Sequence, residues 1–343
     1  MSSVIVFAPG MAHSKRNHPE SYERLREVMA LFEREGVGEL FRPVQPRPAT
    51  IEQVSRVHTL KLIEVIRQVA QGGGGNLDAD TYVTQESYDL ALLAVGGCCL
   101  AADEIVSGRA TNGLALVRPP GHHATFQRFG GFCLFNNIAA TARHVQAVHG
   151  LKRVAIVDFD VHHGNGTQDI FYEDDSVLFV SLHLFSPFFY PGTGKWDEIG
   201  VGSGRGYTLN IPFPPQVGDQ GYQQAFDQLI WPKLALFRPE LILVSAGFDA
   251  HWQDPLAQAA LSLTGYAALG WRLLEMAAQL CQGRILFVLE GGYHLQALHN
   301  GLLNLAWTLT GRDTVHDPLG PAPFPESPVT QLLTRLKQLH LLY

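Results

Sequence analysis

The stretch that decides the fold is VAIVDFDVHHGNG, at residues 154–166. It begins with four consecutive apolar residues, and such a run is typical of a parallel strand that is buried on both faces. Because side chains alternate along a strand, Asp158, Asp160 and His162 are expected to point to the same side. Two acids and an imidazole at the end of a buried strand are costly unless a positive charge compensates them. The stretch favours a divalent metal site, and a buried network of Asp–His hydrogen bonds is the alternative.

Similar apolar runs alternate with longer amphipathic segments along the rest of the chain. We expect strands over 3–8, 114–117, 154–159, 177–183, 241–246 and 285–289, and helices over 22–35, 51–71, 88–107, 137–149, 222–237 and 266–281. One more short helix is expected after the proline-rich stretch 318–328. This alternation predicts an α/β protein with a doubly wound, mainly parallel sheet and helices on both faces. Since no long linker interrupts it, residues 1–343 are expected to form a single domain.

The composition limits the classes of function. Charged residues make up 17% of the 343 residues, below the roughly 25% of an average domain, so a large core is expected. The formal charge of −7 argues against nucleic acid or an anionic membrane as partner. The N-terminus lacks the pattern of a signal peptide, and no apolar run is long enough to span a membrane. We therefore expect a cytoplasmic protein, either a monomer or a weak homo-oligomer.

A third acid follows another buried strand. In parallel sheets, ligands bind at the carboxyl ends of the strands, and Asp249 lies just beyond the apolar run 241–246. Together with Asp160 and His162 it would supply three ligands and leave a fourth position open, which is the arrangement of catalytic zinc. The alternative role for Asp249 is to cap the turn that follows it.

Two further strand ends carry groups suited to catalysis. His122 and His123 follow the strand at 114–117, and histidine is the side chain best suited to proton transfer near neutral pH. Tyr293 follows the strand at 285–289 and could donate its hydroxyl proton to an oxyanion. The alternatives are a surface histidine pair and a tyrosine packed in the core. The glycine-and-aromatic loops at 130–133 and 188–194 either wall an apolar tunnel or pack internally.

Other catalytic fingerprints are missing from the sequence. It contains neither a GxGxxG turn after its first strand nor a GxxxxGK[ST] loop, so dinucleotide and P-loop chemistry are not indicated. It also lacks the GxSxG motif of serine hydrolases.

Taken together, the motifs resemble those of the histone deacetylase and acetylpolyamine amidohydrolase family, in particular its class II branch. They are RPPGHHA (118–124), GFCLFNN (131–137), DFDVHHGNGTQ (158–168), PGTG (191–194), GFDAHWQDPL (247–256) and LEGGY (289–293). They occur in the order of the family and cover nearly the whole chain. The resemblance implies an arginase-like α/β fold and hydrolysis of an acylated amine.

The resemblance also implies the composition of an active site. One zinc ion would be held by Asp160, His162 and Asp249. His123 would be the general base that later acts as an acid, and His122 would act electrostatically. Asp158 would orient His122, and Tyr293 would donate a hydrogen bond to the carbonyl oxygen. Asn165 stands where some branches carry Asp, and its neutral amide suits a base that must start unprotonated.

Substrate and structural-ion residues follow from the same resemblance. The acyl-lysine tunnel would be lined by Gly131, Phe132 and Tyr190. Leu256 stands where polyamine-selective relatives can carry Glu, and Asp80 is either a contact for a peptide backbone or a solvated loop residue. Two structural K⁺ or Na⁺ sites would use backbone oxygens at two sets of positions: Asp158, Asp160, His162, Ser181 and Leu182, and Phe171, Asp174, Val177 and Tyr207.

The function expected from these residues is zinc-dependent removal of acetyl groups from acetyl-lysine side chains or related acylated amines, with release of acetate. Three alternatives stay open. One is an enzyme for acetylpolyamines or other small acylamides. The second is a dinuclear manganese ureohydrolase on the same fold, and the third is a module that binds acyl-lysine without cleaving it.

Overall fold

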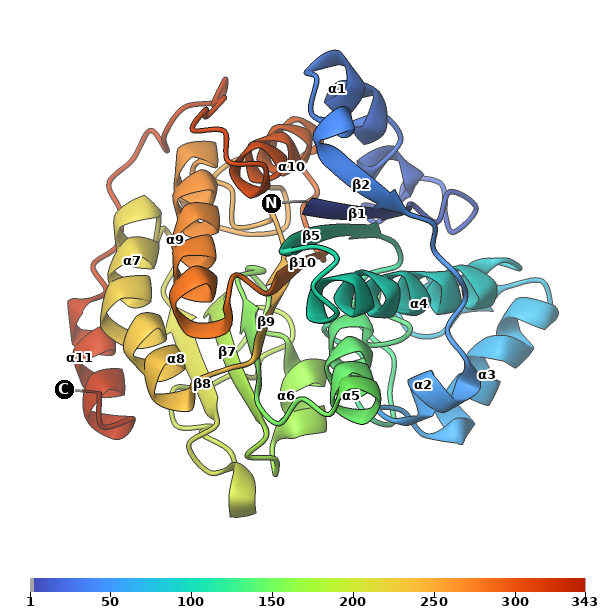
Figure 1. The fold of residues 1–343 in the computed structure, drawn as a ribbon, viewed down its shortest axis with the longest axis horizontal. Coiled ribbons are helices and arrows are strands. Elements are labelled where there is room, and N and C mark those ends of the chain that lie inside the picture. Colours follow the sequence, from blue (N-terminus) through green and yellow to red (C-terminus); the bar gives the residue numbers. More distant parts are fainter. Residues whose placement is uncertain (1–2, 343) are drawn as a thin grey trace.

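A single eight-stranded sheet runs through the computed structural model, which describes residues 3–342. All neighbouring strands are parallel, and their order is β2-β1-β5-β10-β9-β6-β7-β8 (Figure 1). The strands are β1 (Ser3–Ala8), β2 (Phe41–Val44), β5 (Asn112–Val117), β6 (Val154–Asp158), β7 (Val177–Leu184), β8 (Thr208–Phe213), β9 (Leu241–Ala246) and β10 (Ile285–Leu289). A separate antiparallel pair is formed by β3 (Gly75–Asn76) and β4 (Tyr82–Val83).

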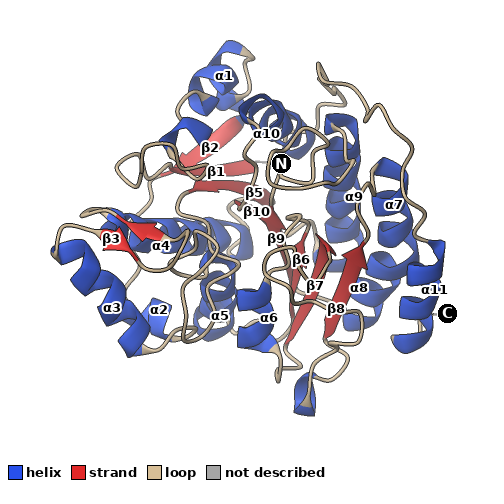
Figure 2. Cartoon of the chain, turned by 180° about the vertical axis from the view of Figure 1, so that it is seen from behind, coloured by secondary structure: helices blue, strands red, loops and turns tan. Residues whose placement is uncertain are grey.

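Helices cover both faces of this sheet (Figures 1 and 2). On one face lie α2 (Ile51–Ser55), α3 (Leu60–Gln71), α4 (Ser87–Val106), α5 (Asn137–His149) and α6 (Asn165–Phe171). On the other lie α1 (Val28–Arg34), α7 (Asp219–Ala225), α8 (Trp231–Phe237), α9 (Leu263–Cys281), α10 (Leu295–Leu309) and α11 (Thr330–Leu339). Shorter segments are the 3-10 turns η1 (Tyr22–Arg24), η2 (Gly38–Leu40) and η3 (Gly202–Gly204) and the π-helical turn η4 (Phe226–Ile230). None of the helices in residues 3–342 is long and apolar enough to cross a membrane.

Two hydrophobic cores result from this layering. Alternate residues of each central strand enter opposite cores, as the strand period of two requires: Leu114 and Leu116 of β5 belong to one, and Ala115 and Val117 to the other. All six residues of β5 are buried. The prediction of parallel strands buried on both faces is thus confirmed.

The six predicted strands are confirmed, but the two edge strands β2 and β8 were not predicted. Both contain a proline, Pro43 or Pro212. Proline is tolerated at sheet edges and masks the strand pattern. The predicted helix at 51–71 is interrupted because Thr59 caps α3 by accepting a hydrogen bond from the Leu62 N–H. The predicted helix at 222–237 changes to a π-helical turn before Pro232, which cannot donate a backbone hydrogen bond. The predicted helix at 22–35 is likewise divided into η1 and α1.

The argument from strand alternation at 158–162 was wrong in its geometry. Strand β6 ends at Asp158, and the chain then turns. The backbone N–H of Asp160 donates to Asp158 Oδ1 at 3.1 Å, and that of His162 donates to Asp160 Oδ1 at 2.9 Å. These turns place Asp158 and Asp160 at different nitrogens of the His122 ring, and Asp160 Oδ1 also lies 3.3 Å from His162 Nδ1.

The strand order explains why distant motifs meet. Strands β5, β10, β9 and β6 are consecutive neighbours in the middle of the sheet. Because they are parallel, their carboxyl ends lie along one edge. The loops that carry residues 118–136, 290–294, 247–262 and 159–164 therefore converge there, as expected for a ligand site of an open α/β sheet.

Candidate active site

Two buried carboxylates and one imidazole meet at this edge. His162 Nδ1 lies 3.3 Å from Asp160 Oδ1 and 3.1 Å from Asp249 Oδ2. One ligand atom from each of these three residues lies within 4.8 Å of the other two. Both carboxylates are fully buried, and His162 is 9% exposed. The structure therefore brings together the three side chains that the sequence predicted as metal ligands.

The surrounding backbone holds these carboxylates in place. Asp249 Oδ1 accepts a hydrogen bond from the Val161 N–H at 2.9 Å, so Asp249 does not cap the turn that follows it. Asp160 Oδ2 accepts from the Gly291 N–H at 2.7 Å. A Cβ at Gly247 would lie 2.1 Å from Asp160 Oδ2, so the loop from β9 approaches too closely for a side chain there.

The charges of this group suit a divalent cation. Burial disfavours a charged His162 ring, but its hydrogen bonds to Asp160 and Asp249 outweigh burial and raise its pKa to about 10. Burial, together with the charge of Asp160, raises the pKa of Asp249 to about 7. Two buried acids thus require a positive charge, and the carboxylate and imidazole donors are those that zinc accepts. The residues present fit such an ion.

His122 is held as a charged ring beside this group. Its Nδ1–H donates to Asp158 Oδ2 at 3.0 Å, and its Nε2 lies 3.8 Å from Asp160 Oδ1. Burial opposes the charge, but the carboxylates of Asp158 and Asp160 prevail and raise the pKa of His122 to about 10. Such a ring supplies positive charge and is a poor proton acceptor near neutral pH.

His123 has the opposite protonation state. Its Nδ1–H donates to Asn165 Oδ1 at 2.8 Å, so the neutral ring keeps Nε2 as the free acceptor. Burial and the charges of His122 and His162 hold the pKa of His123 well below its usual value. The ring lines the candidate cavity. Among the two histidines, His123 is therefore the one that can take a proton.

Tyr293 lines the same cavity as His123 and is held by two residues without a predicted role, Asp254 and Arg24. Asp254 Oδ2 accepts from the backbone N–H of Tyr293 at 2.7 Å. Arg24 donates from Nε to the Gly292 carbonyl at 2.8 Å, and its guanidinium lies 5.0 Å from the centre of the Tyr293 ring. Burial raises the pKa of Tyr293 well above its usual value, so its hydroxyl remains a donor.

A third residue without a predicted role is Glu290, directly after β10. Its Oε2 accepts from the backbone N–H of Gly121 at 2.7 Å and from that of His122 at 3.2 Å. It thereby ties the loop that carries both histidines to the strand that leads to Tyr293. Burial raises the pKa of Glu290 to about 7. The available signal in the sequence was an acid directly after the apolar run 285–289.

A cavity of about 240 Å³ leads down to these groups. Aromatic rings form its walls: the Phe132 ring meets that of Tyr293 at 5.8 Å, the Phe189 ring stacks on His162 at 4.9 Å, and the Tyr190 ring meets His123 at 5.0 Å. All five residues predicted to bind substrate line it: Asp80, Gly131, Phe132, Tyr190 and Leu256. Phe188, which lines it as well, is fully exposed.

The residues predicted to bind monovalent cations occupy two places. One set lies at the paired ends of β6 and β7, where Asp158 is in register with Ser181. In the other set, the Phe171 carbonyl accepts from the Asp174 N–H at 3.1 Å, and the Tyr207 carbonyl accepts from the Phe179 N–H at 2.9 Å. Occupation of either place by an ion stays a prediction.

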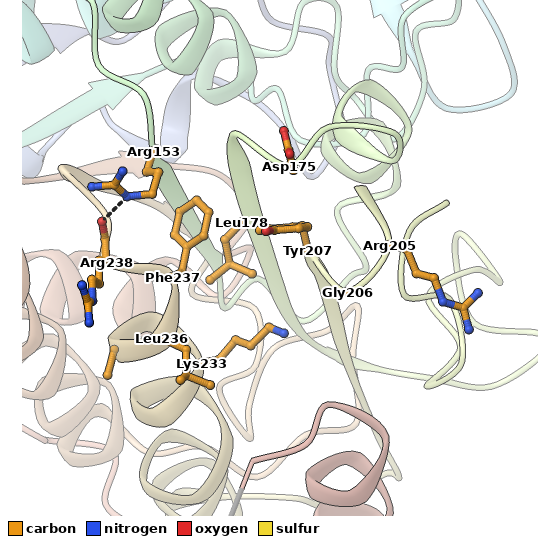
Figure 3. A pocket seen from close by; sticks show the side chains of 11 residues that line it. Arg153, Asp175, Leu178, Arg205, Gly206, Tyr207, Lys233, Leu236, Phe237 and Arg238 are labelled. Carbon is orange, nitrogen blue, oxygen red and sulfur yellow. Dashed lines mark hydrogen bonds between the residues drawn. The ribbon is translucent and has the colours of Figure 1, made fainter. Parts of the chain in front are cut away.

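A larger cavity, of about 690 Å³, lies at the amino ends of β6, β7 and β8, opposite to the carboxyl ends that carry the candidate site (Figure 3). Its lining includes Arg153 just before β6, Leu178 near the start of β7 and Tyr207 just before β8. Lys233 and Arg238 also line it, and their charged groups point in different directions in Figure 3. The larger cavity thus lies away from every strand end that carries the candidate catalytic groups.

Comparison with known proteins gives a consistent result. The sequence pattern of the histone deacetylase domain matches residues 18–309. A probable deacetylase of Archaeoglobus fulgidus is 41% identical, over 93% of this chain and 87% of that protein. A histone deacetylase-like amidohydrolase of Pseudomonas aeruginosa is 39% identical, over 88% of this chain and 80% of that protein.

Among solved structures, the crystal structure of the HDA15 HD domain superposes with a TM-score of 0.91 at 37% identity. The match covers 99% of this chain and 96% of that one. The predicted arginase-like deacetylase fold is thereby confirmed. The family resemblance read from the motifs is confirmed as well, because the matched segment spans most of the chain. The chain belongs to the histone deacetylase family.

Proposed function

We propose that the protein is a zinc-dependent deacetylase that removes acetyl groups from acetyl-lysine side chains or related acylated amines. The observation that carries this proposal is the position of a neutral His123 beside Asp160, His162 and Asp249, at the base of an aromatic cavity. Membership of the deacetylase family supports an acetylated substrate.

Asp160, His162 and Asp249 would hold the zinc ion. When bound, the ion would polarise the acyl carbonyl and lower the pKa of a water molecule towards about 7. The backbone donors of Val161 and Gly291 fix the orientation of the two carboxylates, and this support limits the freedom of the ligands.

The proton transfers are assigned to His123. Its free Nε2 accepts the proton of the attacking water while Asn165 holds the Nδ1–H. The same Nε2 then gives that proton to the leaving amine nitrogen, so water and the amide become acetate and a free amine. Tyr293 donates its hydroxyl hydrogen bond to the carbonyl oxygen as negative charge develops there. The charged His122 adds positive charge beside the reacting atoms.

The cavity supports a substrate with an apolar stem. Rings of Phe132 and Phe189 flank a path that suits the methylene chain of lysine. Leu256 on the lining offers no carboxylate to a second ammonium group, so we place acetyl-lysine ahead of acetylpolyamine. Asp80 also lines the cavity and would accept a hydrogen bond from a peptide backbone.

The proposal is tested by Tyr293→Phe. Loss of one donor to an oxyanion costs about 2.7–4 kcal/mol, so kcat should fall about 10²–10³-fold on an acetyl-lysine peptide. Zinc content should not change, because Tyr293 is not among the three ligand residues. Steady-state kinetics and metal analysis of the same preparation give both readouts, with Tyr88→Phe on α4 as the matched control.

Two results would contradict the proposal. A Tyr293→Phe variant with the kcat of the parent would show that the Tyr293 hydroxyl does not stabilise the charge on the carbonyl oxygen. A parent chain that binds zinc but releases neither acetate from acetyl-lysine peptides and acetylpolyamines nor the longer carboxylate from longer acylamines would indicate a binding module instead. Two manganese ions per chain would favour the ureohydrolase alternative.

A further inference from the structure

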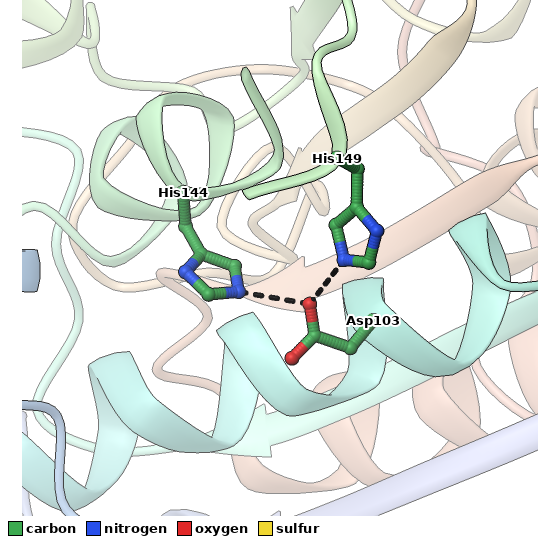
Figure 4. Close-up of side chains that lie close together, drawn as sticks. All are labelled: Asp103, His144 and His149. Atoms are coloured by element: carbon green, nitrogen blue, oxygen red, sulfur yellow. Dashed lines mark hydrogen bonds and ion pairs between the residues drawn. The ribbon is translucent and has the colours of Figure 1, made fainter. Parts of the chain in front are cut away.

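A second group of metal-ligand side chains lies between α4 and α5. Asp103 projects from α4, and His144 and His149 project from α5, so that both imidazoles point at one carboxylate oxygen (Figure 4). Asp103 Oδ1 lies 2.8 Å from His144 Nε2 and 2.6 Å from His149 Nε2. No role in the proposed deacetylation involves these residues, and none of them lines the candidate cavity.

We propose that Asp103, His144 and His149 bind a divalent transition metal ion of the zinc type. Two imidazoles and one carboxylate are a donor set that zinc accepts. Ligand atoms about 2.0–2.1 Å from a tetrahedral ion stand about 3.3 Å apart. The separations of 2.8 and 2.6 Å therefore need to widen by about 0.5 and about 0.7 Å. One atom from each residue already lies within 4.8 Å of the other two.

The exposure of the group leaves room for the remaining ligands. The side chain of His144 is 8% exposed, whereas those of Asp103 and His149 are each 24% exposed. Water can therefore complete the coordination from the solvent side. The ion would join two packed helices, and it would stabilise the folded chain because the unfolded chain does not bring the three side chains together.

Binding requires a change of tautomer. The Nε2–H groups of both imidazoles face Asp103, and a metal ion would replace these protons. The proton of each ring then moves to Nδ1. In the described part of the chain, His149 Nδ1 has no hydrogen-bond partner, so the change there is free. His144 Nδ1 instead accepts from Gln53 Nε2 at 3.2 Å, a contact that must open.

The contact with Gln53 gives a test with a predicted sign. Gln53 Oε1 accepts from the Thr50 N–H at 2.8 Å in the capping box that starts α2, and Glu at position 53 preserves that box. The second carboxylate oxygen of Glu would accept from His144 Nδ1–H, as in carboxylate–histidine–zinc arrangements. Gln53→Glu should therefore tighten zinc binding about tenfold.

The experiment is a titration of metal-free protein with Zn²⁺ in competition with a chromophoric chelator. Asp103→Asn keeps an oxygen that can accept both imidazole hydrogen bonds but removes the anionic ligand. It should bind one zinc ion fewer per chain than the parent, whatever the stoichiometry at Asp160, His162 and Asp249. His149→Gln should lose the same single ion. The exposed His316→Gln is the control for loss of a surface histidine and should bind as the parent does.

The outcomes separate a metal site from a network of hydrogen bonds. Loss of one zinc ion in Asp103→Asn, together with tighter binding in Gln53→Glu, supports the proposal. Equal zinc uptake by the parent, Asp103→Asn and His149→Gln would overturn it. Weaker binding in Gln53→Glu would overturn the assigned tautomer, since an added carboxylate can then no longer be the partner of His144 Nδ1.

Discussion

Two groups of aspartate and histidine with similar donors differ in their surroundings. The group of Asp160, His162 and Asp249 lies at the buried ends of β6 and β9. Its two carboxylates accept hydrogen bonds from backbone N–H groups. The second group, Asp103, His144 and His149, lies between α4 and α5. Its single carboxylate, that of Asp103, has only side-chain partners among the described residues.

The difference shows how burial changes the demand for positive charge. Two buried acids require a positive charge, and the His162 ring can supply it because its pKa is raised to about 10 against the cost of burial. A single partly exposed acid keeps access to water and makes no such demand. We therefore expect the buried group to bind metal more tightly, and the partly exposed group to bind it more weakly, in place of its two imidazole–carboxylate hydrogen bonds.

The largest effect is expected from Asp160→Asn. It removes one proposed ligand and one of the two carboxylates of this group, so the chain should lose the zinc ion that we propose there and more than about a thousandfold in kcat/KM. Metal analysis and acetate release measure the two losses. Asp227→Asn, an exposed aspartate paired with Arg272, is the matched control. An Asp160→Asn variant that keeps its activity without zinc would contradict the proposed metal role of the buried group.

A smaller loss is expected from Asp254→Asn. Its carboxylate holds the backbone N–H groups of Tyr293 and His294 at 2.7 and 3.1 Å. Displacement of Tyr293 should lower kcat by up to about a hundredfold with little change in zinc content. Asp317→Asn, at another loop aspartate that accepts from a backbone N–H at 2.8 Å, is the control. A fall in KM alone would contradict the assigned positioning.

A third prediction tests whether carboxylates, rather than burial, raise histidine pKa values here. His58 is buried with a backbone carbonyl at Nδ1 and a backbone N–H at Nε2. Burial lowers its pKa from 6.5 to about 4, although its hydrogen bond to Thr125 opposes this change. The unfolded chain therefore binds a proton first as pH falls, and the stability from His58 is full above pH 6.5 and is lost towards pH 4.

The size of that effect can be measured by urea unfolding. Between pH 7 and pH 5, His58 alone should lower the free energy of unfolding by about 2 kcal/mol. His58→Gln should reduce the pH dependence in this interval by that amount, whatever its effect on stability at pH 7. An unchanged dependence would show that His58 has the same pKa in the folded and in the unfolded chain, which would contradict a pKa lowered by burial.

Much of the fold could be predicted because the central strands are uniformly apolar. The edge strands β2 and β8 were missed because Pro43 and Pro212 hide their pattern, and the breaks near Thr59 and Pro232 depend on local capping. The metal-ligand group could be predicted because acids at buried strand ends are costly. Single residues do not encode which loops pack together, so the roles of Asp254, Glu290 and Arg24 appeared only in the structure.

We propose that a metal ion at Asp160, His162 and Asp249 makes this chain a deacetylase. To test this claim, metal-free protein is titrated with Zn²⁺, and the acetate released from an acetyl-lysine peptide is measured at each step. We predict that activity rises with the first equivalent and then stays level, because the buried group binds first. Full activity without zinc, or no acetate at any zinc loading, would contradict the claim.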